Sequence, residues 1–202
     1  MKKPPLFQQI LGKDWDKLPE VIRRHYRLPS GNILQNRVSG TMAIDYPWFV
    51  TPILKMIRLF GGLIDAKGTN NAVTVDKQVD PDRPDCIFWR REIIPPDGAT
   101  IVFASRMEYQ QANELIEFIG GGFGLHLKLT VENGRLVYRS NGHLWQVGNI
   151  RIPVPDVLML GHATITETAV SDNEFELDFR IRHPLFGDTY RYGGLFKISQ
   201  PE

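Results

Sequence analysis

The densest group of side chains that could do chemistry lies near the end of the chain, in residues 182–196. This segment places a histidine, two tyrosines, two arginines and three glycines around one predicted turn. His183 precedes Pro184, which favours an extended backbone at a strand end, where an imidazole can act as acid or base or can hydrogen-bond the turn. Tyr190 and Tyr192 share one face of a strand, because strand side chains alternate. Packing is the expected role of both tyrosines, and ligand contact is the alternative.

Charged side chains also interrupt several predicted strands. Half of them must point outward from a two-faced sheet, and ion pairing in solvent is the default interpretation for each. The alternative is that a few converge on a cavity in a curled sheet, where arginines hold an anionic group and tyrosines the apolar body of a ligand. The candidate ligand-binding residues are Arg90, Arg106, Glu117, His126, His183, Tyr190 and Tyr192.

The remaining motifs point away from cofactor and metal chemistry. The glycine run at 120–124 fits neither the Rossmann nor the Walker spacing, and a bend in a strand is the better interpretation. The other four histidines show no spacing typical of metal ligands. Cys86 is expected to be a small buried side chain. The sequence therefore predicts no cofactor and no metal.

Size and composition are those of an ordinary globular domain. The chain has 202 residues, of which 42% are hydrophobic and 23% charged, so we expect one domain over residues 1–202. The net charge of +1, with scattered basic residues, predicts no nucleic-acid partner. The single cysteine excludes an internal disulfide. No secretory signal and no apolar run near the ~20 residues of a membrane-spanning helix are recognised, which predicts a cytoplasmic protein.

Most of the chain has the residue pattern of β-strands separated by short turns, such as Glu132-Asn133-Gly134. Short connections join antiparallel neighbours. Residues 148–159, which contain Pro153 and Pro155, are predicted to be a loop with one helical turn at 155–160. The predicted strands are 33–44, 72–79, 86–94, 100–109, 114–119, 123–131, 135–140, 163–170, 174–182 and 189–198.

Two helices are predicted near the N-terminus. Residues 16–26 begin with a capping aspartate and carry apolar side chains on one face. Residues 48–64 form a short helix that is hydrophobic nearly all round, which is typical of a helix buried on most sides. The less favoured alternative is a lid or membrane-surface segment, with Lys55 and Arg58 on lipid headgroups.

Together these elements predict an α+β fold that is mainly β. About nine or ten antiparallel strands form a strongly curved or closed sheet, because twist accumulates and open edges invite aggregation. One hydrophobic helix and a short N-terminal helix pack against it. A small closed barrel of this kind can hold one ligand.

The chain also resembles an uncharacterised bacterial family, the domain of unknown function numbered 4166. The resemblance lies in short pieces spread over nearly the full length, in a fixed order. It implies no activity. Related domains are often joined to NAD(P)-binding reductase-like domains, so the resemblance implies at most a separate partner of that kind. The matching pieces are Leu6-Phe7-Gln8, Leu11-Gly12, Leu18-Pro19, His25, Trp89-Arg90-Arg91, Glu117, Ile152-Pro153-Val154-Pro155, His183-Pro184-Leu185-Phe186-Gly187, Tyr190 and Tyr192-Gly193-Gly194-Leu195.

Three functions stay open at this point. The first is a module that binds an apolar or lipid-like small molecule in a partly polar cavity. The second is an enzyme in the same cavity, with His183 or Glu117 as general acid or base. The third is an accessory domain for a reductase-like partner. Ligand, reaction and oligomeric state are not specified by the sequence.

Overall fold

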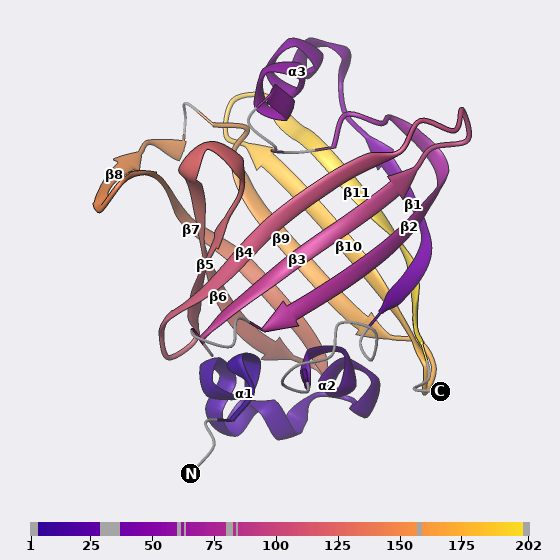
Figure 1. The fold of residues 1–202 in the computed structure, drawn as a ribbon, viewed down its shortest axis with the longest axis vertical. Helices are drawn as coiled ribbons and strands as arrows, with labels where there is room; N and C mark the ends of the chain where they lie inside the picture. Colours follow the sequence, from indigo (N-terminus) through magenta and orange to yellow (C-terminus); the bar gives the residue numbers. More distant parts are fainter. Residues whose placement is uncertain are drawn as a thin grey trace.

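The computed structural model describes residues 4–28, 37–59, 62, 64–79, 83, 85–156 and 159–199. Within these residues, eleven strands form one antiparallel sheet, and ten of them close into a barrel (Figure 1). The strands are β1 (Val38–Asp45), β2 (Gly68–Val79), β3 (Cys86–Ile94), β4 (Ile101–Gln111), β5 (Glu114–Phe118), β6 (Phe123–Glu132), β7 (Arg135–Val147), β8 (Ile150–Val154), β9 (His162–Ala169), β10 (Glu174–His183) and β11 (Gly187–Ile198).

Strands that follow one another in the chain lie side by side in the sheet, and the sheet closes where the last strand pairs with the first. Each strand from β1 to β7 pairs with the next, β7 pairs with β9, and β11 returns to pair with β1 along Val38–Asp45. The strand β8 branches off, pairing with residues 143–147 of β7 outside the ring (Figure 1). A closed wall removes the exposed edges that an open sheet of this size would present.

Alternation along each strand divides the side chains between the interior and the outer face. In β3, Ile87, Trp89 and Ile93 are buried inside, whereas Phe88 and Arg90 are exposed outside. The inner faces of the ten strands supply most of one large hydrophobic core. A half-polar strand of this kind is the expected pattern for a sheet with one face in water.

The N-terminal segment covers one end of the barrel. It consists of α1 (Leu6–Leu11), the 3₁₀ helix η1 (Gly12–Lys17) and α2 (Glu20–Tyr26), which lie together below the strands in Figure 1. Its side chains Phe7, Ile10, Ile22 and Tyr26 are fully buried against the barrel interior. The opposite end carries the 3₁₀ helix η3 (Trp48–Val50) and α3 (Thr51–Leu59).

The predicted fold class is confirmed, with differences in individual elements. The predicted helix at 16–26 begins at Glu20, and α1 was not predicted. The predicted loop at 148–159 contains β8, whose Pro153 fits a strand outside the ring. The first predicted strand starts at residue 33, outside the described residues, as do residues 157 and 158 of the predicted turn.

The expectation that the helix at 48–64 is buried on most sides is wrong. Val50 and Leu54 are buried, but Trp48, Ile53 and Met56 are exposed. The helix covers the end of the barrel instead of entering it (Figure 1), so one apolar side faces the barrel and a second faces solvent. A helix that is apolar nearly all round is usually buried because protein surrounds it. Here the barrel contacts only one side of the helix.

Candidate functional site

A cavity of about 160 Å³ lies inside the barrel, between the N-terminal segment and α3. Its walls are mostly apolar and include Phe103, Met107 and Phe179 from the strands. Tyr26 at the end of α2 lines it at one end, and Ile57 of α3 lines it at the other. We call these the closed end and the α3 end. The cavity therefore spans the barrel along its axis.

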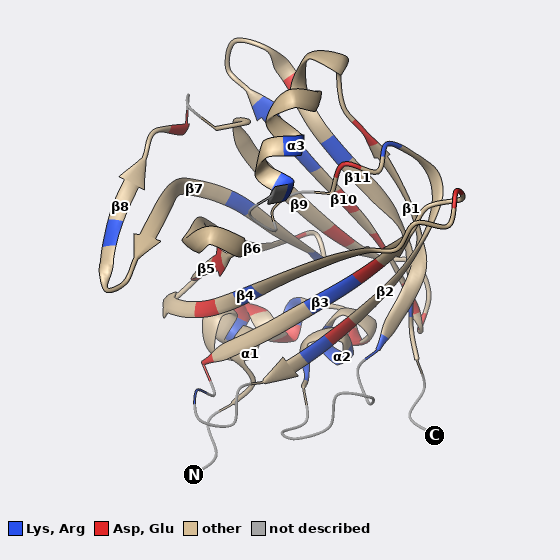
Figure 2. Cartoon of the chain, turned by 45° about the horizontal axis from the view of Figure 1, so that its top comes forward, with Lys and Arg blue, Asp and Glu red and all other residues tan. Residues whose placement is uncertain are grey.

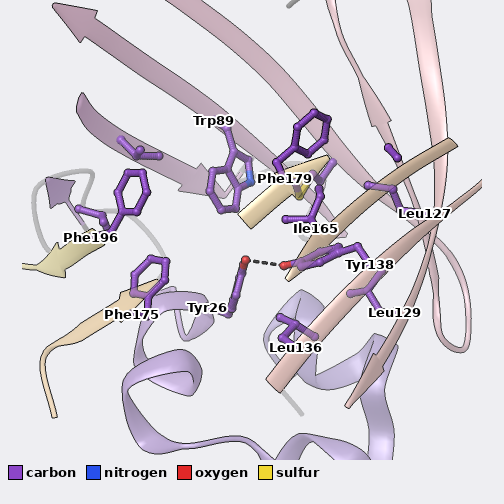
Figure 3. Packing of buried hydrophobic residues seen from close by; sticks show 14 of the residues in the cluster. Tyr26, Trp89, Leu127, Leu129, Leu136, Tyr138, Ile165, Phe175, Phe179 and Phe196 are labelled. Carbon is purple, nitrogen blue, oxygen red and sulfur yellow. Dashed lines mark hydrogen bonds between the residues drawn. The ribbon is translucent and has the colours of Figure 1, made fainter. Parts of the chain in front are cut away.

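A hydrogen-bonded group of three side chains occupies the closed end. The Tyr26 hydroxyl donates to Glu167 Oε1 at 2.6 Å and contacts the hydroxyl of Tyr138. Tyr26 comes from α2, Tyr138 from β7 and Glu167 from β9, and Figure 3 shows the two hydroxyls pointing toward each other. The ring of Phe7 stacks on Tyr26 with centroids 3.8 Å apart. The N-terminal segment thus positions the tyrosine that closes the cavity.

Glu167 carries a carboxyl group in an apolar enclosure. Burial raises its pKa from 4.5 to about 7, although Tyr26, Lys77 and Arg91 all favour the charged form. Burial also raises the pKa of Tyr26 and Tyr138 well above 10.0. At neutral pH the tyrosines are therefore neutral donors, and Glu167 is close to half ionised.

Two buried polar atoms of cavity-lining side chains have no hydrogen-bond partner. They are Glu167 Oε2, which can accept, and the indole Nε1 of Trp89, which can only donate. Leaving a buried polar group unpaired costs about 1–3 kcal/mol, and native proteins retain few such groups. These two atoms mark the closed end as a place where a polar group from outside the chain would be held.

Lys77 lies near the closed end, beside the rings of Tyr26 and Trp89. Lys77 Nζ is 2.8 Å from His25 Nδ1 and also donates to the His25 carbonyl oxygen. It lies 5.1 Å from the centre of the Trp89 ring and 5.5 Å from that of Tyr26, as in a cation–π contact. Burial lowers the pKa of both Lys77 and His25. His25 is therefore neutral.

A partly buried ion pair between Arg91 and Glu117 lines the wall formed by β3, β4 and β5. Arg91 donates to Glu117 Oε1 at 3.3 Å and to Ser105 Oγ at 2.9 Å, and Ser105 donates to the same Glu117 oxygen at 2.6 Å. The guanidinium lies 5.0 Å from the centre of the Trp89 ring and 4.9 Å from that of Phe103. Because its charge is already paired, Arg91 can orient a polar ligand without being left uncompensated.

The comparisons with known proteins support the family resemblance seen in the sequence. A family model described as a domain of unknown function (DUF4166) matches residues 18–196, which is most of the chain. The chain belongs to the DUF4166 family. A search of curated proteins found no match for this DUF4166 chain.

Two solved structures are similar to this DUF4166 barrel. One is the S-type phycobiliprotein lyase CPES from Guillardia theta, with 8% identity, a TM-score of 0.43, and 82% of this chain and 87% of that chain covered. The other is a protein of unknown function of the DUF3598 family from Nostoc punctiforme, with 8% identity, a TM-score of 0.19, and coverage of 83% and 97%. At these scores neither likeness carries a functional argument.

Two of the seven predicted site residues line the cavity of the DUF4166 barrel. They are Glu117 and Tyr192. Tyr192 stacks on Phe179 with ring centroids 4.6 Å apart, and burial raises its pKa to about 12. Tyr190 is buried on the same face of β11, but its hydroxyl donates to the carbonyl oxygen of Ile64 at 2.7 Å. It holds the chain segment that follows α3.

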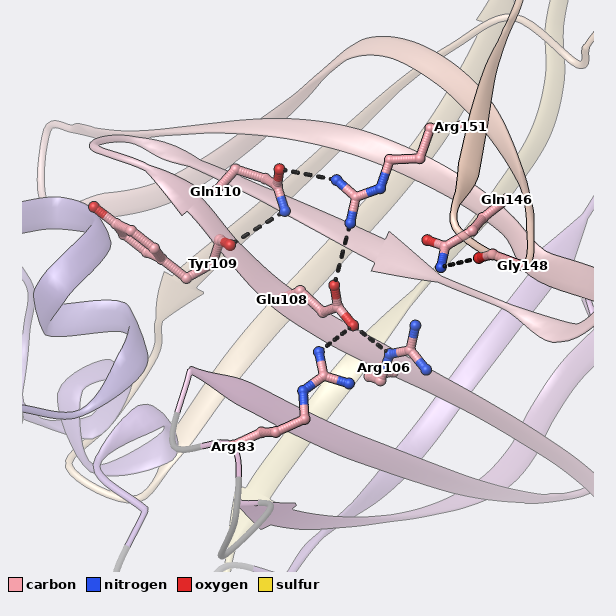
Figure 4. Close-up of polar contacts among 8 residues, drawn as sticks. All are labelled: Arg83, Arg106, Glu108, Tyr109, Gln110, Gln146, Gly148 and Arg151. Carbon is pink, nitrogen blue, oxygen red and sulfur yellow. Dashed lines mark hydrogen bonds and ion pairs between the residues drawn. The ribbon is translucent and has the colours of Figure 1, made fainter.

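The two predicted arginines lie on the outer face. Arg90 is exposed and forms an ion pair with Glu92. Arg106 Nε lies 2.7 Å from Glu108 Oε1, which Arg83 Nη2 approaches at 2.6 Å. Figure 4 shows Arg151 of β8 reaching the other oxygen of Glu108, with atoms 3.6 Å apart. This outer cluster ties β8 to β4 and does not contact the cavity.

The two predicted histidines also lie away from the cavity lining. His183 is buried at the end of β10, where Nδ1 accepts from the Leu185 amide at 3.1 Å and the ring stacks on Phe186. His126 pairs with Ile116 in the register of β5 and β6. Partial burial lowers its pKa. The structure thus separates His183 from Glu117, and within the described residues no group of side chains has a metal-binding arrangement.

The cavity contains groups that the sequence reasoning missed, chiefly Arg91 and Glu167. The sequence does contain a pattern that identifies them, because each lies on the same face of its strand as the buried apolar residues. Glu167 follows Ala163 and Ile165 at spacing two, and Arg91 lies between the buried Trp89 and Ile93 in the same way. A charged residue on the apolar phase of a strand points inward.

Proposed function

We propose that the protein binds a small, largely apolar molecule inside the barrel, with one polar group of that molecule at the closed end. The observation that carries this proposal is the pair of unpartnered buried atoms, Glu167 Oε2 and Trp89 Nε1, in an otherwise apolar cavity. One needs a donor and the other an acceptor. A hydroxyl group supplies both, which favours an alcohol or a phenol as the chemical class.

The size of the cavity limits what can enter. An apolar cavity of about 150 Å³ in another protein binds benzene, and the cavity here measures about 160 Å³. A single ring or a short aliphatic group therefore fits beside the closed end. The tail of a longer, lipid-like molecule would leave at the α3 end, where Ile57 and Ile64 form the wall.

The test uses two probes that differ by one hydroxyl, p-cresol and toluene. Binding to the full chain is measured by calorimetry at pH 8, where most Glu167 side chains are ionised. We expect p-cresol to bind at least about tenfold more tightly, because a hydrogen bond to a charged group contributes roughly 1.5–3 kcal/mol. Equal affinities would contradict the role of the closed end, and failure of both probes would contradict the binding cavity.

Two variants that each replace a glutamate by leucine separate the role of the closed end from the effect of losing a negative charge elsewhere. Glu167→Leu should reduce the preference for p-cresol by at least about tenfold while toluene still binds. Glu176→Leu, at an exposed position of β10, should change neither affinity. Native mass spectrometry of gently purified protein then identifies the natural ligand, and a co-purifying small molecule with a hydroxyl group would support the proposal.

A second function is favoured by one specific observation, the pKa of Glu167 near 7. A carboxyl group with a pKa near the working pH is suited to general acid–base catalysis, and Tyr26 is within hydrogen-bond distance. Catalysis would then use Glu167 and not the pairing of His183 with Glu117. Turnover with a pH profile that has an inflection near 7, lost in Glu167→Gln, would establish this alternative.

A further inference from the structure

Exposed apolar side chains gather on the outer side of the α3 end. Trp48 is 85% exposed, Leu185 75% and Phe186 64%, values unusual for residues of this size. Two separate segments contribute, η3 with α3 and the turn between β10 and β11. We call this set the mouth patch: Trp48, Phe49, Ile53, Met56, Leu185 and Phe186.

The two segments of the mouth patch form one surface. The rings of Phe49 and Phe186 lie 6.0 Å apart between centroids, and Trp48 packs edge-on against Phe49 at 6.2 Å. The stacking of Phe186 on the buried His183 fixes the turn beneath it. A contiguous exposed apolar patch is uncommon on a soluble surface and marks an interaction site.

The inner side of the same helix forms the roof of the cavity. Val50 of η3 and Leu54 of α3 are buried on this inner side, and Ile57 of α3 lines the cavity. The part of the mouth patch on η3 and α3 therefore lies on the opposite side of a single helical layer from the α3 end of the cavity. Any surface that contacts the patch comes within one helix diameter, roughly 10 Å, of the cavity.

Charge at the patch is basic. Lys55 and Arg58 lie three residues apart on one flank of α3, and Figure 2 shows basic positions on this helix. Residues 46–64 contain no aspartate or glutamate. Arg58 pairs with Asp65 at 2.7 Å, whereas for Lys55 the described residues give no ion pair. An apolar surface flanked by lysine complements the phosphate groups and acyl chains of a lipid bilayer.

We propose that the mouth patch docks the α3 end of the barrel on the surface of a lipid bilayer. Trp48 and Phe49 lie at the boundary between headgroups and acyl chains, where aromatic side chains are favoured, and Lys55 lies among the phosphates. Among the described residues, no helix is long and apolar enough to cross a membrane.

The size of the patch favours a bilayer over a second copy of the chain. A stable protein interface takes roughly 20–30 residues from each partner. The mouth patch offers six apolar side chains on two projecting segments. Projecting tips can enter a fluid surface without a complementary partner, whereas a dimer would need a broader matched face.

Docking in this position places the α3 end of the cavity next to an apolar phase. A ligand could then pass between the bilayer and the barrel beneath α3 without crossing water. This consequence rests on the proposed ligand-binding function. The docking itself does not, because the patch is exposed whatever the cavity holds.

The test is flotation of the full chain with phosphatidylcholine vesicles, prepared with and without phosphatidylglycerol. We expect binding to both and stronger binding to the anionic vesicles. Trp48→Ala combined with Leu185→Ser should weaken binding at least about tenfold, since it removes the two most exposed side chains of the mouth patch. Val170→Ser is the matched control, because Val170 is 57% exposed in the turn that follows β9 and lies outside the mouth patch. It should bind as the wild type does.

A second measurement covers the case in which a variant fails to fold. In the wild-type chain, tryptophan emission should shift to shorter wavelength when anionic vesicles are added, and Trp48→Phe should lose most of that shift. Lys55→Glu should remove the preference for anionic vesicles. No flotation of the wild type, or a dimer in solution that Trp48→Ala dissociates, would overturn the proposal. Because p-cresol binding is measured without lipid, failure of docking and failure of the ligand site are distinguishable.

Discussion

At the scale of single residues, the closed end of the cavity retains buried charge at a cost to stability. Glu167 has a pKa of about 7 in the folded chain, against 4.5 for an exposed glutamate. Lys77 and Arg91 favour the carboxylate, as does the Tyr26 hydroxyl, but burial outweighs all three. A side chain that lowers stability and faces a cavity is more easily explained by a ligand than by packing.

The pH dependence of stability follows from this shift. Between pH 4.5 and 7 the folded chain binds more protons at Glu167 than the unfolded chain does, so the free energy of unfolding falls as pH rises through that window. Below pH 4.5 both states are protonated and the carboxyl is neutral. Above pH 7 the cost is on the order of 3 kcal/mol, at about 1.4 kcal/mol for each pKa unit.

Replacement of Glu167 by glutamine should remove this cost. We expect Glu167→Gln to raise the free energy of unfolding by about 2–3 kcal/mol at pH 8 and to change it little at pH 5. Urea unfolding at the two pH values measures the difference. Glu176→Gln on the outer face should have no effect at either pH. An equal change at both pH values would attribute the effect to packing and not to charge.

The sequence predicted the kinds of residue in the site better than their positions. It favoured Arg90, whereas the arginine in the cavity is its neighbour Arg91. A shift of one residue moves a strand side chain to the opposite face, so the choice depends on which phase is apolar. Trp89 lies on that phase, and the same rule identifies Glu167. The unpartnered atoms could not be predicted, because they depend on contacts between distant strands.

At the scale of elements, β1 and β11 form a seam where two backbones approach closely. A Cβ atom at Gly194 would lie 2.0 Å from the Thr41 carbonyl oxygen, and one at Gly40 would lie 2.2 Å from that of Leu195. Glycine inside a strand commonly marks a bulge or a close approach of another backbone. At Gly193 and Gly194 it is the close approach, since the pairing of β11 with β1 and with β10 keeps its register at both residues.

A methyl group at this seam should separate the two strands. We expect Gly194→Ala to lower the free energy of unfolding by about 2 kcal/mol or more, because the neighbouring atoms are backbone and cannot rotate away. Leu195→Ala, at a side chain 44% exposed on the same strand, should cost less than about 1 kcal/mol. Guanidinium unfolding of the pair measures both. Similar small costs would mean that the seam opens without strain.

Two elements, α3 and β8, could not be predicted correctly from the local sequence pattern. The α3 segment is apolar on two sides, and periodicity alone does not tell which side meets protein and which meets another apolar phase. The strand β8 lies in a stretch with Pro153 and Pro155, which demote a strand prediction. Besides its pairing with β7, the strand is held by Arg151, whose Nη1 donates to Gln110 of β4 at 3.2 Å. That contact spans 41 residues and has no local signature.

At the scale of the whole molecule, the closed barrel follows from short turns and strand number. Ten ring strands within the described residues pair in chain order, and the last returns to the first. The sequence predicted such a curved or closed sheet, because the turn motifs were readable and accumulated twist brings the edges together. It did not predict that the N-terminal segment would seal one end, since the residues of that segment contact strands far along the chain.

The N-terminal segment that covers one end of the barrel can be tested at Phe7. Phe7 is fully buried and stacks on Tyr26, so it supports the tyrosine that holds Glu167. Phe7→Ala should lower the free energy of unfolding by about 3–5 kcal/mol, the usual range for a buried phenylalanine. It should also weaken p-cresol binding, because Tyr26 and Glu167 lose their fixed positions. Urea unfolding and calorimetry measure the two effects.

Phe186→Ala is the matched control, since the same substitution is made at the opposite end of the barrel. Phe186 is exposed, so its loss should change stability by less than about 1 kcal/mol and leave p-cresol binding unchanged. It should instead weaken vesicle binding, which Phe7→Ala should not affect. The two variants therefore test the ends of the molecule separately, the one proposed to hold the ligand and the one proposed to contact the bilayer. If Phe7→Ala left p-cresol affinity unchanged, the N-terminal segment would be a structural plug without a role in the site.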